Sequence, residues 1–142
     1  MLLLGINWLF LILVNVQMEQ AKVLEDFRWK NRVFIINASP LDEIEEKQFE
    51  DRKLLYFQFQ EDRLETSNYE GEINLESFMK IIKAQPTENW YLIGLDGGVK
   101  RTGKGSPNVD QIWEIIDAMP MRQSEIRKEK KDGIFKKCKE LP

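Results

Sequence analysis

The chain has 142 residues, enough for one ordinary domain but too few for a second full one. Hydrophobic residues make up 42% of it and charged residues 32%, a balance that supports a folded core and excludes a disordered chain. The net charge of −3 gives no overall positive field for specific nucleic-acid binding. With no histidine and one cysteine, the chain lacks the residues for histidine-based catalysis, a cysteine-histidine zinc site or an internal disulfide.

The amino terminus carries an apolar run over residues 2–16. This run is shorter than the roughly 20 residues of a membrane-spanning helix and has the length of the apolar part of a secretory signal. We therefore interpret residues 1–21 as a signal peptide, or alternatively as an uncleaved membrane anchor, and residues 22–142 as one domain. The first helix of a cytoplasmic domain is a further alternative. The expected location is secreted or periplasmic, with membrane proximity in the anchored form.

The first half of the domain predicts two strands and a helix. The continuous apolar run 33–36 is typical of a strand that is buried on both faces of a sheet. A capping signal that begins at Ser39 predicts a helix over residues 40–51, with Ser39 as its cap. A second apolar and aromatic strand is predicted over residues 54–59, and the polar residues 61–72 are predicted to form a loop.

The second half predicts two helices and a hairpin. Apolar residues at helical spacing predict a helix over residues 75–82. A third strand is expected over residues 90–95. The Asp-Gly-Gly turn at residues 96–98 then predicts a hairpin to an edge strand at residues 99–102. Helical spacing returns over residues 109–119, and a charged helical tail follows.

The order of elements is therefore β-α-β-α-β-β-α with a helical C-terminal tail. Each β-α-β step predicts a right-handed crossover between parallel neighbours, whereas the hairpin adds an antiparallel edge strand. We expect an α/β fold: a thioredoxin-like three-layer sandwich, in which a mixed four-stranded sheet has helices on both faces. A fold of this kind hosts many functions, so it names no reaction.

Two segments carry a family resemblance: residues 91–100, which read YLIGLDGGVK, and residues 116–126, which read IDAMPMRQSEI. They resemble a bacterial domain-of-unknown-function family that is similar to the C-terminal domain of sushi-repeat-containing extracellular proteins. The resemblance runs from about Phe27 to Cys138 and includes Arg32. It implies a thioredoxin-like fold related to peroxiredoxins and an extracytoplasmic location, and it implies no particular reaction.

The place of a redox thiol in such a fold is the junction of the first strand and the first helix, because a helix N-terminus stabilises a thiolate. Ser39 occupies this place. Without a histidine to activate it, serine is a weak nucleophile, so we interpret Ser39 as a helix cap. The weak catalytic candidate is Cys138, whose lysine neighbours would favour its thiolate. A thiol or peroxide oxidoreductase that uses Cys138 is therefore the alternative function.

A small polar cluster is the candidate binding site. Its members surround the 96–98 turn and the end of the last predicted helix: Asp96, Lys100, Asp117, Arg122 and Glu125. A structural interpretation competes with the functional one. In it, Asp117 pairs with Arg122 or Lys100, while Met119 and Met121 pack on the sheet. Both interpretations stay open at this stage.

Charge is spread unevenly, since the C-terminal third is basic and the rest of the domain is acidic. The basic tail could contact an anionic surface, although charged runs are most often solvated faces. We therefore predict an exported thioredoxin-like domain without the cleft cysteine, which works as a binding or interaction module rather than as an enzyme. Its expected partner is an unknown protein or an anionic cell-surface molecule, with no cofactor and no metal.

Overall fold

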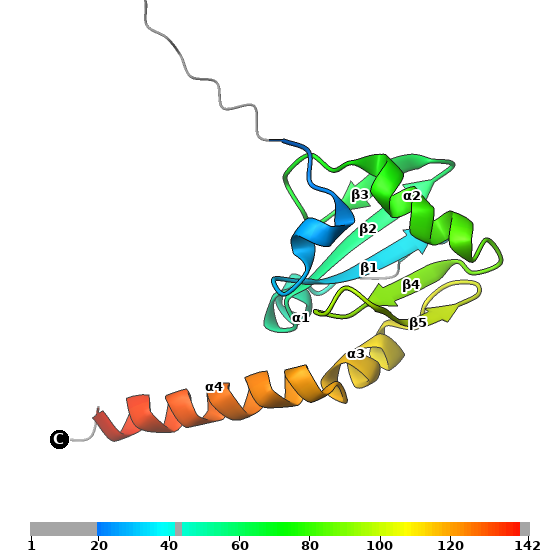
Figure 1. The fold of residues 1–142 in the computed structure, drawn as a ribbon. Helices are drawn as coiled ribbons and strands as arrows, with labels where there is room; N and C mark the ends of the chain where they lie inside the picture. Colours follow the sequence, from blue (N-terminus) through cyan, green and yellow to red (C-terminus); the bar gives the residue numbers. More distant parts are fainter. Residues whose placement is uncertain (1–19, 42–43, 140–142) are drawn as a thin grey trace, which may run out of the picture.

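The computed structural model describes residues 20–41 and 44–139 (Figure 1). The expected signal peptide or anchor, residues 1–21, therefore lies almost wholly outside the described residues. Within the two described ranges, none of the helices combines the length and the apolar character that crossing a membrane requires.

A five-stranded mixed sheet forms the centre of the domain, with the strands in the order β3-β2-β1-β4-β5. The strands are β1 (Arg32–Asn37), β2 (Leu54–Gln60), β3 (Arg63–Ser67), β4 (Trp90–Ile93) and β5 (Val99–Gly103). The helices are the short 3-10 helix η1 (Leu24–Phe27), α1 (Glu46–Asp51), α2 (Leu75–Ala84), α3 (Val109–Asp117) and α4 (Pro120–Lys139). Strand β1 is central and pairs parallel with β2 and antiparallel with β4.

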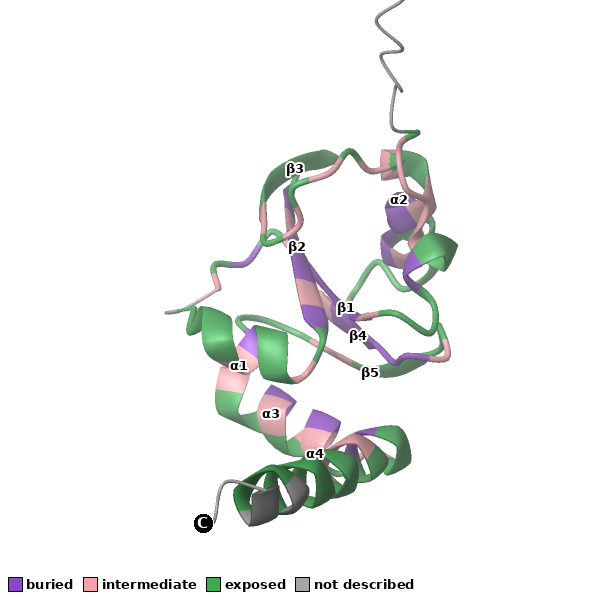
Figure 2. Cartoon of the chain, turned by 90° about the vertical axis from the view of Figure 1, so that its left-hand side faces the viewer, coloured by how far each residue is buried: buried purple, intermediate pink, exposed green. Residues whose placement is uncertain are grey.

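Helices cover both faces of the sheet, as the sequence predicts (Figure 2). On one face, α2 and η1 pack over an aromatic core that includes Phe57 and Phe78. On the other face, α1 and α3 pack over a second core that includes Phe34, Phe49 and Ile112. The predicted two-sided burial of the first strand is confirmed, because its apolar residues alternate between these two cores.

Strand β3 corrects the prediction of a loop over residues 61–72. Glu61 and Asp62 form a two-residue turn in which both φ angles are positive, 49° and 55°, the arrangement of tight hairpin turns. The usual signals for such a turn are Asn-Gly and Asp-Gly, and the sequence has no glycine there. Because β3 is exposed along most of its length, it also lacks the apolar pattern by which a strand is recognised.

The extra strand changes the topology. The sheet has five strands instead of the expected four, and only the step from β1 through α1 to β2 joins parallel neighbours. Strand β3 runs antiparallel to β2, so the chain enters α2 from the opposite end of the sheet to the one at which β2 ends. Strand β4, which follows α2, lies antiparallel to β1. The second predicted parallel pair is therefore wrong.

The first helix also begins later than predicted. A helix was expected over residues 40–51 with Ser39 as its cap, but α1 covers only Glu46–Asp51. Ala38 has a φ of 53°, which turns the chain sharply as it leaves β1. The Ser39 hydroxyl then donates a hydrogen bond to Oγ of Ser106 (3.1 Å), so Ser39 does not cap a helix.

The C-terminal elements agree with the sequence. The 96–98 turn forms the hairpin between β4 and β5, with Gly97 at a φ of 80°. Helix α3 lies within the predicted range, and the charged tail forms α4. Figure 1 shows α4 extending from the α3 end of the domain away from the sheet.

Tyr91 ties β4 to the end of α2. Its side chain is buried, and its hydroxyl lies 2.6 Å from the carbonyl oxygen of Gln85 and 3.0 Å from that of Glu88. Burial, followed by the nearby Glu88 charge, raises the pKa of Tyr91. The hydroxyl therefore stays protonated and donates to these carbonyls.

We expect Tyr91→Phe to lower the free energy of unfolding by about 1–2 kcal/mol, because the carbonyl oxygens of Gln85 and Glu88 lose the donor that the buried Tyr91 side chain provides. Tyr69→Phe is the matched control. Tyr69 packs its ring against Phe27 in the same core, and no described residue hydrogen-bonds to its hydroxyl. Tyr69→Phe should therefore lower the free energy of unfolding by less than about 0.5 kcal/mol. Urea unfolding measures both values, and equal losses would contradict this role of Tyr91.

Candidate functional site

Arg32 is a fully buried charged residue at the start of β1, with 0% of its surface exposed. Its Nη1 donates to the carbonyl oxygen of Arg52 (2.7 Å) and to Oε2 of Glu125 (3.3 Å). Its Nε and Nη2 have no hydrogen-bond partner among the described residues. Leaving buried donors unpaired costs stability, so this free edge of the guanidinium needs a physical explanation.

The position of Arg32 follows from the strand that it begins. Its backbone N–H donates to the carbonyl oxygen of Lys53, just before β2, and its Cα is paired with Leu54 in the parallel register. The apolar residues 33–36 that follow lock β1 into the centre of the sheet. Arg32 is therefore held where β1 begins, close to the start of α4.

Glu125 of α4 is shared by three cations. Its carboxylate lies 3.3 Å from Arg32, 3.6 Å from Lys53 and 3.6 Å from Arg122. Arg122 is itself buried, and its Nη1 also lies 3.6 Å from Glu129. At 3.6 Å the contacts of Glu125 with Lys53 and Arg122 are ion pairs too long for hydrogen bonds, and Nη1 of Arg122 has no hydrogen-bond partner among the described residues.

Asp117, at the end of α3, holds the other half of the network. Both of its carboxylate oxygens accept hydrogen bonds from Arg52, at 3.0 and 2.6 Å, in the two-pronged arrangement that suits guanidinium. The Arg52 guanidinium also lies over the ring of Trp113, 4.8 Å from its centre. Asp117 reaches Arg122 at 3.4 Å, so the expected pairing exists but Arg52 is the closer partner.

Asp96 and Lys100 form a separate ion pair at the β4–β5 turn, with 2.5 Å between Oδ2 and Nζ. The Lys100 hydrogen bond, aided by one from the backbone N–H of Gly98, lowers the pKa of Asp96. Both side chains are exposed by more than a third. The pair is therefore neutralised locally and stays in contact with solvent.

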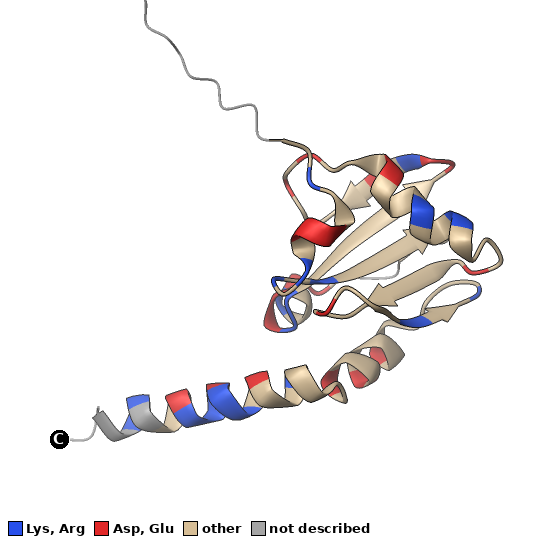
Figure 3. Ribbon diagram, in the orientation of Figure 1, with Lys and Arg blue, Asp and Glu red and all other residues tan. Residues whose placement is uncertain are grey.

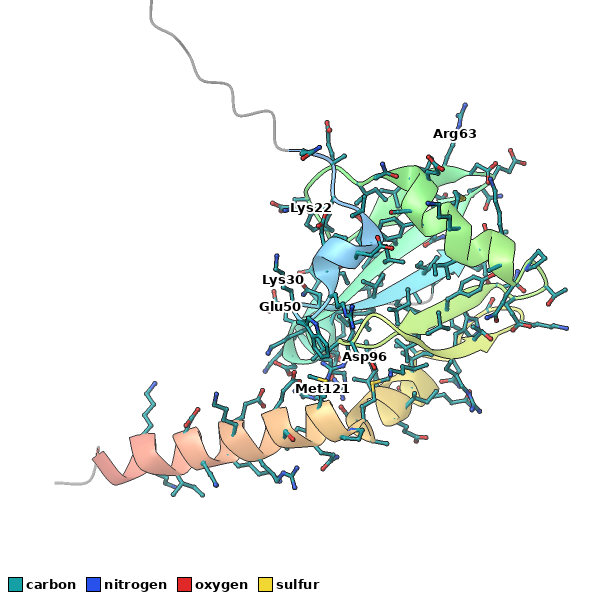
Figure 4. All side chains as sticks on the ribbon, in the orientation of Figure 1. Lys22, Lys30, Glu50, Arg63, Asp96 and Met121 are labelled. Carbon is teal, nitrogen blue, oxygen red and sulfur yellow. The ribbon has the colours of Figure 1, made fainter. Side chains whose placement is uncertain are left out.

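A pocket of about 250 Å³ lies where these two groups approach each other, and we call it the Arg32 pocket. Its wall includes Arg32, Leu95, Asp96, Lys100, Met119 and Met121. Figure 4 shows Asp96 and Met121 next to each other between the sheet and α4. The pocket thus joins the β4–β5 turn to the start of α4.

The five predicted site residues fall into two sets. Asp117, Arg122 and Glu125 lie in one ion-pair network, whereas the Asp96–Lys100 pair lies at the pocket wall. Arg32 connects the two sets, because it pairs with Glu125 and also lines the pocket beside Asp96 and Lys100. Sequence reasoning did not select it as a site residue. The available signal was its position as a charged residue at the head of an apolar strand.

The two methionines differ. Met119 packs against the core beneath α3, as expected. Met121 was expected to pack on the sheet, but 43% of its surface is exposed, so that expectation is wrong. Met121 lies in the first turn of α4 and forms part of the wall of the Arg32 pocket instead.

The redox candidates lie apart from this pocket. Ser39 is buried behind the C-terminal end of β1, whereas Arg32 begins that strand. Cys138 belongs to the last turn of α4, and its side chain lies outside the described part of the structure. Figure 1 shows this end of α4 projecting away from the sheet. Among the described residues, no group of three or more acidic or cysteine side chains forms a candidate metal site.

Two other surface features are less specific. A wider hollow of about 540 Å³ beside α1 is lined by Glu50, Glu70 and others, and none of the described unpaired buried donors belongs to it. Along α4, lysine and arginine outnumber acidic residues (Figure 3), and residues 128–134 are exposed. Contact of this basic helix with an anionic surface stays a prediction from the sequence.

The ion-pair network predicts that the carboxylate of Glu125 stabilises the fold. Glu125→Gln removes the carboxylate that Arg32, Lys53 and Arg122 share, and it leaves the buried guanidinium of Arg32 uncompensated. The Glu125 side chain is only 16% exposed, so we expect the free energy of unfolding to fall by about 2–3 kcal/mol.

Glu129→Gln is the matched control on the same helix. It also removes a contact with Arg122, but Glu129 is 65% exposed, so the loss should be about 0.5 kcal/mol or less. Urea unfolding of both variants distinguishes the two sites. Losses of the same size would show that the Glu125 network does not support the fold.

Comparison with known proteins identifies a family. Residues 23–125 match the model of DUF4174, a domain of unknown function. The matched segment contains the whole sheet, α1 to α3 and the beginning of α4, so it includes both Arg32 and Glu125. Neither the curated proteins nor the solved structures give a match. The match covers well over half of the chain, which therefore belongs to the DUF4174 family of domains of unknown function.

Proposed function

We propose that this domain is a non-catalytic binding module and that the Arg32 pocket receives an anionic group of its ligand. The observation that carries the proposal is the free edge of Arg32, where two buried donor nitrogens, Nε and Nη2, lack an acceptor among the described residues. An anion would supply that acceptor through charge-assisted hydrogen bonds, which are the strong ones.

The balance of charge in the two ion-pair groups that meet at the pocket favours an anion over a cation or a neutral ligand. Five cations belong to the two ion-pair groups: Arg32, Arg52, Lys53, Lys100 and Arg122. Four carboxylates face them: Asp96, Asp117, Glu125 and Glu129. One cation is thus in excess among these described contacts, and a single negative charge would balance it.

We further propose that the domain has a thioredoxin-like fold with β3 as an added edge strand. When β3 is set aside, the remaining order is β2-β1-β4-β5, with one parallel pair and two antiparallel pairs. Helix α1 connects the parallel pair, and a hairpin joins the last two strands. This pattern supports the relation to thioredoxin-like proteins that the resemblance of residues 91–100 and 116–126 implies.

Export is also part of the proposal. It is supported by the apolar run at residues 2–16 and by the resemblance to the C-terminal domain of sushi-repeat-containing extracellular proteins. A secreted or periplasmic module would meet small molecules and exposed ends of other chains, both of which offer anionic groups.

The local structure at the thiol position supports a function without redox chemistry. Ser39 stands where the thiol would be, and the first described turn of α1 begins only at Glu46. The positive end of a helix dipole therefore does not stabilise an anion at Ser39. The Cys138 oxidoreductase alternative gains no support from α4, whose C-terminal end leads away from this region (Figure 1).

A turnover assay separates the binding module from that alternative. The full chain and its Cys138→Ser variant are supplied with peroxide, or with a disulfide substrate, in the presence of a thiol reductant. We expect both proteins to show only the background rate that is measured in buffer without protein. Thiol-dependent turnover that disappears in Cys138→Ser would replace the binding proposal with a single-cysteine redox enzyme.

Anion binding itself is tested with acetate, sulfate and phosphate, each titrated against chloride at constant ionic strength. The ε-methyl NMR signal of Met119 reports on the pocket wall, and we expect a saturable shift with at least one of these anions. Absence of a saturable shift with all three would contradict the proposal.

Met121 provides a matched pair of variants, because it is exposed and lines the pocket. Met121→Glu places a negative charge, like that of the ligand, at the pocket wall and should weaken anion binding about tenfold. Met121→Gln has nearly the same shape without the charge and should change the affinity by less than about twofold. Equal effects of the two variants would show that charge at this wall is irrelevant to binding.

A further inference from the structure

We infer that the anionic group bound in the Arg32 pocket is a carboxylate attached to a short apolar group. This inference rests on the proposed function and specifies the chemical class of its ligand. It draws on three features of the described residues: which donors of Arg32 are free, what covers the pocket wall, and how large the pocket is.

The free donors of Arg32 lie on one edge of the guanidinium. Nη1 is occupied by the carbonyl oxygen of Arg52 and by Glu125, whereas Nε and Nη2 are free. The N–H bonds of Nε and Nη2 on this edge run nearly parallel, so they match the two oxygens of one carboxylate. Arg52 already binds Asp117 through this edge, which shows the same arrangement elsewhere in the network.

A phosphate or sulfate fits the pocket less well. Two of its oxygens could occupy the same edge, but the others would face the wall formed by Leu95, Met119 and Met121. Lys100, the other cation at the wall, is already paired with Asp96. Burying oxygens of an anion against apolar side chains without donors is costly, whereas a carboxylate leaves no oxygen unpaired.

The size and the wall together define the rest of the ligand. At about 250 Å³ the pocket is smaller than the range of roughly 300–1,000 Å³ that holds drug-sized molecules. Besides Arg32 and the Asp96–Lys100 pair, the wall consists mainly of apolar side chains. A short branched aliphatic chain fits this space, and it occurs both in free small acids and at the C-terminal residue of a peptide.

Entry of the carboxylate requires a small movement of the wall. The free donors of Arg32 have almost no surface in contact with water, so a ligand reaches them only when a neighbouring side chain shifts. Methionine has three rotatable bonds and repacks at little cost, and two methionines line this pocket. We therefore expect binding to move Met119 or Met121 while the backbone stays in place.

The experiment uses the full chain with methionine ε-methyl labels and four probes. Isovalerate represents a free acid, N-acetyl-leucine represents a peptide C-terminus, isovaleramide is the uncharged control, and phosphate is the tetrahedral control. We expect the acids to shift the signals of Met119 and Met121 and to bind at least about tenfold more tightly than isovaleramide or phosphate. Met79 lies in the core on the opposite face of the sheet, and its signal should not move.

The probes also separate the two sources of the carboxylate. Tighter binding of N-acetyl-leucine supports a chain end as the natural ligand, and tighter binding of isovalerate supports a free acid. If phosphate saturates the pocket and neither acid does, the carboxylate inference is overturned while the anion-binding function stands. If no probe binds, both fail.

Two variants test the contacts themselves. Arg32→Lys keeps the charge but removes the two-pronged edge, and we expect it to bind isovalerate at least about tenfold more weakly. Because Arg32 also supports the fold, Met121→Ala on the exposed wall gives an independent test. This variant should weaken the binding of isovalerate about fivefold and the binding of acetate by less than about twofold. Only isovalerate has a branched apolar chain that would lose its contact with the Met121 side chain. Equal effects on the two acids would refute the apolar wall.

Discussion

The burial of Arg32 at the head of β1 determines how the C-terminal third of this domain is arranged. A guanidinium removed from water needs negative partners, and the nearest one comes from α4, 93 residues later in the chain. Glu125 meets this need only if α4 begins beside the start of β1. The same carboxylate reaches Lys53, which precedes β2, so a single residue connects the central strand, its parallel neighbour and the last helix.

Such a network sets geometry more than it adds stability, because desolvation of buried charges offsets much of their attraction. Its geometric effect is visible at the junction of α3 and α4. Pro120 stands at the first position of α4, where its fixed φ favours a helix start and its missing N–H costs nothing. Arg122 and Glu125 then hold the first turns against the sheet. Glu129 pairs only with Arg122 of the same helix, and beyond Glu125 no ion pair with the sheet is found among the described residues, so the helix continues into solvent.

The sequence predicts those parts of the fold that repeat an apolar period or use a turn with glycine. Strand β1, helices α2 and α3, and the hairpin at residues 96–98 belong to this group. Strand β3 and the late start of α1 do not. They depend on positive φ angles at Glu61, Asp62 and Ala38, none of which is a glycine, so the turns leave no glycine signal in the sequence. The site shows the same division. Asp117, Arg122 and Glu125 are close in sequence, whereas their contacts with Arg52 and Arg32 span 65 and 93 residues and become visible only in the fold.

The two ends of β1 have different side chains, and this difference determines where a domain with a thioredoxin-like fold could bind its ligand. Ser39 follows the C-terminal end of the strand, where such a plan would place a redox thiol. Arg32 begins the strand, so its six residues place the pocket on the order of 20 Å away. Under the proposed function, a serine rather than a thiol after the C-terminal end of β1 does not affect the Arg32 end, because the two ends share a strand but no side-chain contact among the described residues. A ligand site at the start of β1 would then depend on α4 and the β4–β5 turn, and these are the elements that the residues resembling the family, 91–100 and 116–126, supply.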